Sequence, residues 1–164
     1  MTIIKQEDFI QSIADAFQFI SYYHPVDYIE ALTEAWEKEE NPAAKDAMTQ
    51  ILVNSRMCAE GHRPICQDTG IATVFLKVGM KVQWDAQMSV AEMVNEGVRR
   101  AYLLPENKLR ASVLADPAGK RINTKDNTPA VIHMEIVAGD KVEVTCAAKG
   151  GGSENKSKLA MLNP

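Results

Sequence analysis

Apolar residues in the first 60 positions recur with the period of an α-helix. Three amphipathic stripes follow one another, and each would place its apolar side chains on one helical face. The stripes are Phe9, Ile13, Phe17 and Ile20; Val26, Ile29, Leu32 and Trp36; and Ala44, Met48, Ile51 and Leu52. Pro25 fits the first turn of the second helix, and Asn41-Pro42 supplies a cap and a first-turn proline for the third. We therefore expect residues 1–60 to form a helical part with these stripes turned inward.

After residue 64 the apolar period changes to two. Residues 71–78 alternate between two faces, which predicts a strand. Ser89-Val90-Ala91-Glu92 is a capping box and predicts a helix that reaches about Tyr102. Two further alternating runs, 131–137 and 141–148, are joined by Ala138-Gly139-Asp140, a pattern typical of a β-hairpin. A short helical pattern then runs up to Pro164.

Helices followed by strands, with one helix inserted among them, favour an α+β fold. We expect a mostly antiparallel sheet with helices packed on it. Residues 1–164 would form one domain, divided into the helical part (1–60) and an α+β part (61–164). The last helical pattern has barely begun at Asn163-Pro164. We therefore expect this chain to be a fragment or one domain of a longer protein.

The composition is that of an ordinary globular protein, since 46% of the 164 residues are apolar and 24% are charged. The 18 basic and 22 acidic side chains give a formal charge of −4, which excludes an overall basic field that would attract nucleic acid. No apolar run reaches the ~18–20 residues of a membrane span, and the amino terminus does not read as a signal peptide. Three cysteines are an odd set, which argues against a disulfide framework and favours a reducing, cytoplasmic location.

The segment between the third helix and the first strand gathers metal-ligating side chains. Cys58, His62 and Cys66 stand four residues apart, which could suggest zinc. A structural zinc site needs four ligands, however, and no fourth is present in the segment. Gly61 and Pro64 would also break the helix that could align the three residues. Zinc binding is therefore the less favoured interpretation of this segment.

Cys66 differs from the other two cysteines because polar residues surround it. Gln67 and Asp68 follow it directly on a predicted loop, where functional residues concentrate. A thiolate flanked by hydrogen-bonding groups suits an iron–sulfur cluster better than zinc. Cys58 would lie on a helix face and Cys146 alternates with valines in a strand, so we expect both to be core thiols.

A glycine triplet and an arginine could bind an anion. Gly150–Gly152 follow a predicted strand and free successive backbone amides to point at one spot. The helical pattern that follows would add its N-terminal dipole. A flexible connection is the alternative. Arg110 could hold a carboxylate through two parallel hydrogen bonds, and an ordinary surface arginine is the alternative there.

These segments together resemble one enzyme family. Cys66-Gln67-Asp68-Thr69-Gly70 and, about eighty residues later, Lys149-Gly150-Gly151-Gly152-Ser153-Glu154-Asn155-Lys156 resemble the iron–sulfur (class I) fumarate hydratases. The stretches Asn107–Ser112 and Asn127–Ala130 also match. The alpha subunits of two-subunit fumarases and of L-tartrate dehydratases share the pattern. The resemblance covers essentially the whole chain.

The resemblance implies a site built around a [4Fe–4S] cluster. Three cysteines hold the cluster in this family and leave one iron open for the substrate. Cys66 matches the first ligand, and Gln67, Asp68, Arg110 and Gly152 match positions that contact the dicarboxylate. Asp68 also matches a position close to the proton transfer and is the catalytic candidate. The other two cluster cysteines and the threonine that acts as base would lie beyond Pro164.

The expected function is therefore that of a hydro-lyase. The full-length protein would reversibly hydrate fumarate to L-malate, with the open iron as Lewis acid. This chain alone would be inactive, because a missing C-terminal portion or a partner subunit must complete the site. A homodimer is expected, with no nucleic acid or membrane partner. The alternatives are the alpha subunit of an L-tartrate dehydratase and a non-catalytic subunit or assembly module.

Overall fold

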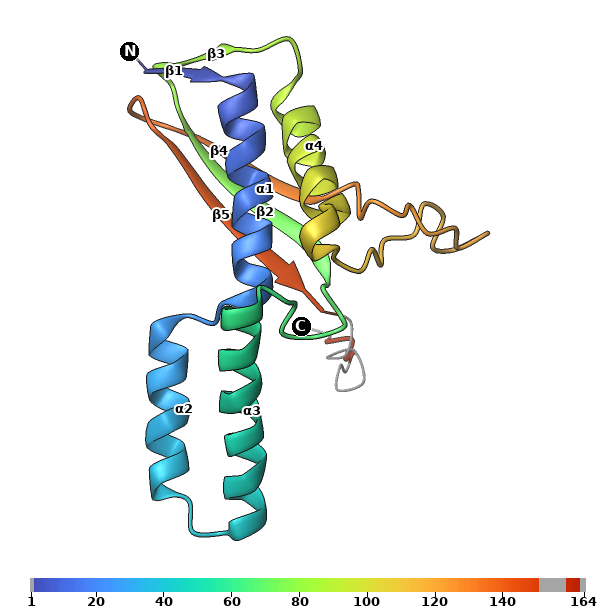
Figure 1. Ribbon diagram of the computed structural model, residues 1–164. Helices are drawn as coiled ribbons and strands as arrows, with labels where there is room; N and C mark the ends of the chain where they lie inside the picture. Colours follow the sequence, from blue (N-terminus) through green and yellow to red (C-terminus); the bar gives the residue numbers. More distant parts are fainter. Residues whose placement is uncertain (1, 151–158, 163–164) are drawn as a thin grey trace.

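The computed structural model describes residues 2–150 and 159–162 of the chain. Among these, β2 (Ile71–Gly79), β4 (Val131–Val137) and β5 (Val142–Lys149) form a three-stranded sheet. Helices α1 (Gln6–Tyr22) and α4 (Val90–Leu103) lie side by side on one face of that sheet (Figure 1). The predicted α+β class is confirmed. The helical pattern before Pro164 falls largely on residues outside the described ranges.

The hydrophobic core lies between the two helices and the sheet. The α1 stripe is confirmed, with Ile20 partly buried at its end, and alternate residues of β2 point into the same core as predicted. The buried members are Phe9, Ile10, Ile13, Ala14 and Phe17; Ala72, Val74, Leu76 and Val78; and Met93, Val94, Val98, Ala101, Tyr102 and Leu109.

Helix α4 begins where the sequence predicts. The Ser89 hydroxyl accepts the Glu92 N–H at 3.3 Å, and the Glu92 carboxylate accepts the Ser89 N–H at 2.8 Å. This reciprocal pair satisfies two donors that the first turn of a helix leaves free, and it lowers the pKa of the Glu92 carboxyl through those hydrogen bonds. The predicted capping box is therefore confirmed.

The strand pairing differs from the prediction. Strand β2 lies between β4 and β5, parallel to the first and antiparallel to the second, so the sheet is mixed rather than mostly antiparallel. The predicted hairpin is wrong, because its two strands are separated by β2. Residues 138–141 cross the end of β2, where Gly79 N–H donates to Lys141 O at 2.8 Å. Four residues extend ~13 Å, enough to cross the ~9.5 Å of two strand spacings.

Two short strands were not predicted. Thr2–Lys5 forms β1, which pairs in parallel with β3 (Val82–Asp85), so the first residues are not helical. Each strand has only four residues, too few for a period of two to stand out in the sequence. Gln6 is the first residue of α1, and its side chain binds the segment between β3 and α4. Its carbonyl oxygen accepts the Gln87 and Met88 N–H groups at 3.0 and 3.1 Å. The start of α1 is thereby tied to the approach to α4.

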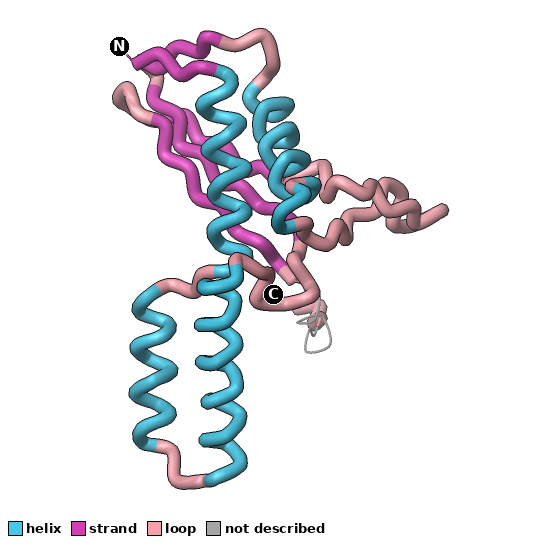
Figure 2. The backbone as a smooth tube through the Cα atoms, viewed as in Figure 1, coloured by secondary structure: helices cyan, strands magenta, loops and turns pink. Residues whose placement is uncertain are grey.

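Helices α2 (Val26–Lys38) and α3 (Pro42–Gly61) form a hairpin that projects from the body (Figures 1 and 2). Among the described residues of α2 none is buried, and in α3 only Ser55 and Cys58 are. The two predicted stripes face each other, where the Trp36 indole N–H donates to Thr49 Oγ1 at 2.8 Å. Val26 is nevertheless 73% exposed and Ile51 42%. The expectation that both stripes are fully turned inward is therefore wrong, because two helices can cover each other on one side only.

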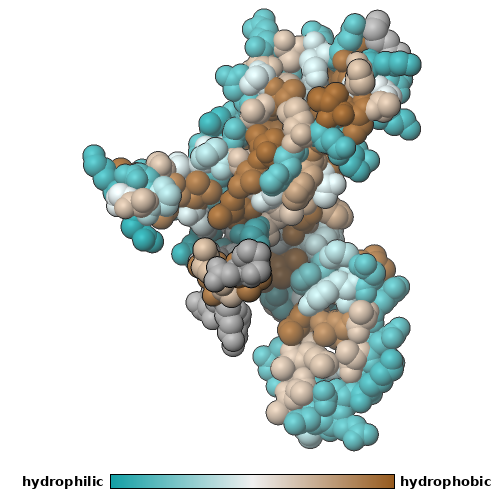
Figure 3. Space-filling model, turned by 180° about the vertical axis from the view of Figure 1, so that it is seen from behind, coloured by the Kyte–Doolittle hydropathy of each residue, from teal (hydrophilic) through white to brown (hydrophobic). Residues whose placement is uncertain are grey.

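The second face of the sheet carries no helix of the described chain. Figure 3 shows this side of the molecule, with apolar side chains gathered along the sheet. Ile71, Phe75 and Val131 are exposed there, and the Phe75 ring stacks on His133 with 4.9 Å between the ring centres. Within the described residues, no helix has the length and apolar character that crossing a membrane requires.

We predict that Gly97→Ala destabilises the protein, because α1 and α4 touch at this glycine. A Cβ atom on residue 97 would lie 2.6 Å from Ile13 Cβ and 2.8 Å from Ile10 O. Overpacking of this kind costs about 1–3 kcal/mol and opposes the ~1 kcal/mol that alanine gains over glycine in a helix. Urea unfolding followed by circular dichroism measures the change. Gly61→Ala is the control, since a Cβ there meets nothing closer than 3.8 Å. Equal unfolding midpoints for both variants would contradict the prediction.

Candidate functional site

The cysteine loop, residues 62–70, connects α3 to β2 and is fixed at both ends. His62 ends α3 in the left-handed conformation, with φ of 47°. The Ile65 N–H donates to Ser21 O at 2.8 Å, and the Asn54 amide donates to Ile65 O at 3.1 Å. The loop therefore starts pinned between α1 and α3. Because α3 stops before His62, a continuous helical face through Cys58, His62 and Cys66 does not form. No group of three His, Cys, Asp or Glu side chains suited to a metal ion occurs among the described residues.

Three of the predicted site residues gather around one sulfur atom. Cys66 is exposed; its thiol donates to Gln67 Oε1 at 3.4 Å, and its sulfur accepts the Asp68 N–H at 3.5 Å. Asp68 Oδ1 in turn accepts the Gly70 N–H at 3.2 Å, which folds the loop back on itself. The cysteine, an amide and a carboxylate are thus presented side by side.

The end of β5 passes directly against this loop. Gly70 has φ of 75°, a conformation that favours glycine, and a Cβ there would lie 2.7 Å from the Lys149 carbonyl carbon. A Cβ on Gly150 would lie 3.2 Å from Asp68 Oδ2. The first glycine of the triplet is therefore adjacent to the Asp68 carboxylate. Gly152 lies outside the described residues, so its predicted role stays a prediction.

Arg110 joins the loop through its main chain. The Thr69 hydroxyl donates to Arg110 O at 2.6 Å, which places residue 110 at the same end of the sheet as Cys66. The Arg110 residue is exposed. The structure thus brings four of the five predicted site residues to one place.

Two residues that hold the site were not predicted. The Tyr102 hydroxyl, on a residue only 1% exposed, donates to Thr69 O at 2.8 Å and lies 3.2 Å from Gly70 O. Asn127 is fully buried, and its amide donates to Gly70 O at 2.9 Å. The sequence marks Tyr102 only as the approximate end of a predicted helix and Asn127 only as the first residue of a stretch that resembles the family. Neither sequence pattern identifies the hydrogen-bond partners of these side chains, Thr69 O and Gly70 O, which lie 30 or more residues away in the chain.

The cavity beneath the cysteine loop is small. Its volume is about 130 Å³, below the ~300–1,000 Å³ that is common for ligand pockets. The lining residues are Phe17, Ile20, Ser21, Ile65, Cys66, Asp68, Thr69, Tyr102, Leu109 and Ala148. The described residues therefore form one wall of a candidate site rather than an enclosed pocket.

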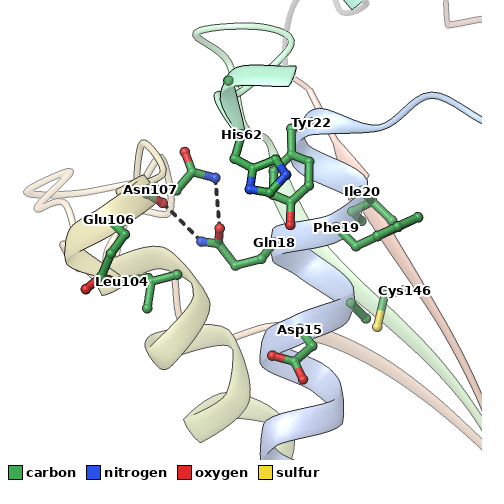
Figure 4. A pocket seen from close by; sticks show the side chains of 12 residues that line it. Asp15, Gln18, Phe19, Ile20, Tyr22, His62, Leu104, Glu106, Asn107 and Cys146 are labelled. Carbon is green, nitrogen blue, oxygen red and sulfur yellow. Dashed lines mark hydrogen bonds between the residues drawn. The ribbon is translucent and has the colours of Figure 1, made fainter. Parts of the chain in front are cut away.

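A larger cavity, of about 680 Å³, lies between α1, His62 and the segment after α4 (Figure 4). None of the predicted site residues lines it. Gln18 donates to Asn107 O at 3.0 Å and to Ala101 O at 2.6 Å, and it accepts from the Asn107 amide at 2.8 Å. The Tyr22 and His62 rings stack with 4.8 Å between their centres. The amide pair joins α1 to the segment after α4, and the ring stack joins α1 to the end of α3, so these contacts stabilise the fold.

The other two cysteines fit the core role that the sequence predicts. Cys58 is buried, and its thiol donates weakly toward Asn54 Oδ1 at 3.7 Å and Pro64 O at 3.6 Å. Cys146 packs against the core, and burial raises the pKa of its thiol to about 11. A thiol with such a pKa stays protonated at neutral pH and is a poor ligand or nucleophile.

Comparison with known proteins shows the class to which this chain belongs. Residues 10–164 match the family described as Fumarate hydratase (Fumerase), and the chain is a member of that hydro-lyase family. The predicted resemblance is therefore confirmed.

The curated relatives include both kinds of enzyme that share the pattern. The chain is 33% identical over 155 residues to the putative L(+)-tartrate dehydratase subunit alpha of Methanocaldococcus jannaschii, covering 93% of this chain and 54% of the relative. It is 40% identical over 121 residues to the anaerobic class I fumarate hydratase of Escherichia coli K12, covering 70% of this chain and 21% of that protein. The chain thus spans about half the length of the first relative and about a fifth of the second.

We predict that Tyr102→Phe lowers the free energy of unfolding at neutral pH by about 1 kcal/mol, because the Thr69 carbonyl loses its donor and Gly70 O keeps only the Asn127 amide. Burial raises the pKa of Tyr102 to about 12, above its ordinary value of 10.0. The native protein therefore keeps a proton that the unfolded chain releases, and the stability of the wild type falls between about pH 10 and 12. The difference in free energy of unfolding between the wild type and Tyr102→Phe should therefore become smaller between about pH 10 and 12.

Urea unfolding at a series of pH values measures both effects. Tyr28→Phe is the control, because Tyr28 is exposed and its loss should change stability by less than ~0.5 kcal/mol. A gap between wild type and Tyr102→Phe that widens as the pH rises would contradict the assignment of the buried phenol.

Proposed function

We propose that this chain is the N-terminal, alpha-type part of a class I hydro-lyase that reversibly hydrates fumarate to L-malate. The observation that carries the proposal is the gathering of Gln67 and Asp68 around the Cys66 sulfur, with Gly150 and the Arg110 main chain against the same loop. Membership of the fumarate hydratase family supports it. A second, longer part of the enzyme completes the site in this proposal.

The donor chemistry of the loop fits one corner of a [4Fe–4S] cluster. Cys66 is exposed on a polar loop, and the Asp68 N–H points at its sulfur, a hydrogen bond that stabilises a thiolate. Cys66 would hold one iron, whereas Cys58 is buried and Cys146 is half-buried with a raised thiol pKa, which makes both less suitable. Two further cysteines would come from outside this chain. When bound, the cluster supplies a Lewis acid that polarises the hydroxyl group of malate.

The residues of this chain would bind the dicarboxylate and move a proton. The Arg110 guanidinium can grip one substrate carboxylate with two parallel hydrogen bonds, and the Gln67 amide can donate a further one. Backbone amides of the glycine triplet, Gly152 included, would serve the second carboxylate. Hydration adds hydroxyl to one alkene carbon and hydrogen to the other, and the Asp68 carboxyl would exchange that hydrogen as a proton.

The second candidate function is that of an L-tartrate dehydratase alpha subunit. The relative from M. jannaschii carries that name and matches 93% of this chain, whereas the E. coli fumarate hydratase matches 70%. A partner subunit would then supply the remaining ligands. Steady-state assays of the anaerobically assembled protein with fumarate, L-malate and L-tartrate distinguish the two. Absence of activity on all three would favour a non-catalytic module.

We predict that Cys66→Ser in the assembled enzyme abolishes both the visible absorption of the cluster and the activity, because one of three thiolate anchors is lost. Cys58→Ser and Cys146→Ala are the matched controls and should cost only about 1 kcal/mol of stability each. Iron and sulfide analysis, absorption spectra and urea unfolding measure these outcomes. A full cluster in the Cys66→Ser variant would refute the ligand assignment.

We also predict that Arg110→Ala lowers kcat/KM for the dicarboxylate by ~10²-fold, the equivalent of ~2.7 kcal/mol of lost carboxylate binding. Lys108→Ala is the control, because it removes the same charge from an exposed residue two positions away. Steady-state kinetics with the cluster content measured in each preparation tests the difference. An equal decrease in kcat/KM for Arg110→Ala and Lys108→Ala would mean that the decrease comes from the change in net charge and not from a specific carboxylate contact of Arg110.

A further inference from the structure

Asn127 makes three side-chain hydrogen bonds to main-chain groups of two distant segments. Its Nδ2 donates to Gly70 O at 2.9 Å, at the end of the cysteine loop. Its Oδ1 accepts the Ser112 N–H at 2.8 Å and the Val113 N–H at 3.3 Å, just after Arg110. The side chain is 0% exposed, so water cannot replace any of these partners. One amide therefore joins the loop that bears Cys66 to the segment that bears Arg110.

The residues on either side of Asn127 are themselves anchored to α4. Arg99 Nε donates to Asp126 Oδ2 at 3.0 Å, and the Ala130 N–H donates to Asn95 Oδ1 at 2.8 Å. Helix α4 belongs to the core, so Asn127 extends from the most firmly packed part of the molecule. A shift of the Arg110 segment relative to Cys66 would break hydrogen bonds of the fully buried Asn127 amide, which is costly.

We propose that Asn127 is a positioning residue that fixes the Arg110 segment relative to the Cys66 loop. It touches neither a substrate nor a cluster. Together with the Thr69 hydroxyl, which donates to Arg110 O, it sets the separation between the group that would bind the carboxylate and the cysteine that would hold the iron. A displacement of ~1 Å between such groups can cost ~10²-fold in rate. The catalytic consequence rests on the function proposed above, whereas the coupling of the two segments does not.

Asn127→Gly removes the side chain without straining the backbone. Asn127 has φ of 63°, which glycine adopts freely and alanine does not. Asn123→Ala is the matched control: the Asn123 amide donates to Ala111 O at 2.9 Å and so supports the same segment, and its Oδ1 accepts the Lys125 N–H, so both hydrogen bonds stay outside the cysteine loop. Asn127→Asp is the third variant, since it keeps an acceptor for Ser112 and Val113 but loses the donor to Gly70 O.

The first test measures 15N NMR order parameters of the Gly70, Ser112 and Val113 amides in the full 164-residue chain. Asn127→Gly should lower all three from the ~0.85 of rigid backbone toward ~0.6. Asn123→Ala should leave Gly70 unchanged. Asn127→Asp should lower the order parameter of the Gly70 amide while those of Ser112 and Val113 stay high. If Asn127→Gly does not fold, Asn127→Asp is the variant that tests the proposal. Unchanged order at Gly70 in both Asn127 variants would overturn the proposal.

The second test measures kcat/KM and cluster content of the assembled enzyme. Asn127→Gly should lower kcat/KM by ~10²-fold at full cluster content, and Asn123→Ala by less than about threefold. An equal decrease in kcat/KM for Asn127→Gly and Asn123→Ala would mean that Asn127 only stabilises the Arg110 segment, and it would refute the proposed positioning role. If the wild type neither hydrates fumarate nor dehydrates L-tartrate, the proposed function fails, while the order parameters still decide whether Asn127 couples the two segments.

Discussion

The central position of β2 creates the candidate site. Because β5 runs antiparallel to β2, with Ile71 opposite Lys149, the start of β2 and the end of β5 meet at one end of the sheet. Because β4 runs parallel to β2, with Val131 opposite Thr73, the residues before β4 reach the same end. The cysteine loop, the first glycine of the triplet and Asn127 are thereby brought together from sequence positions up to about 80 residues apart. A true β4–β5 hairpin without β2 between its strands would not bring these three segments to a common point.

The sequence predicts local features of this arrangement well. The period of α1, the capping box of α4 and the polar character of the Cys66 loop all depend on residues within one or two helical turns of each other. The strand order depends on what lies between two strands, and the turn signal Ala138-Gly139-Asp140 is the same for a tight hairpin as for a crossing over β2. The four-residue strands β1 and β3 are too short to show a period.

The helical hairpin shows a second limit of periodicity. The stripes on α2 and α3 correctly mark the faces that meet, through contacts such as Trp36 with Thr49. They do not indicate how much else covers those helices, which project from the body and have few buried residues (Figure 2). A stripe of apolar residues indicates which side of a helix is turned away from water, whereas the depth of burial depends on how many other elements pack against that helix. Residue Asn127 is the converse case, since a polar side chain in a turn is the most completely buried part of the site.

A buried amide suits the junction of the two segments better than an apolar side chain would. An apolar residue of equal volume could fill the space between Gly70 and Ser112, but it would accept many relative positions of the two main chains. Three directional hydrogen bonds accept only a narrow range, because each must keep its length and angle. Tyr102, whose raised pKa keeps its hydroxyl protonated, adds a second donor at Thr69 and Gly70. The polar junction therefore contributes specificity of position, which is what a site assembled from loops at the end of a small sheet otherwise lacks.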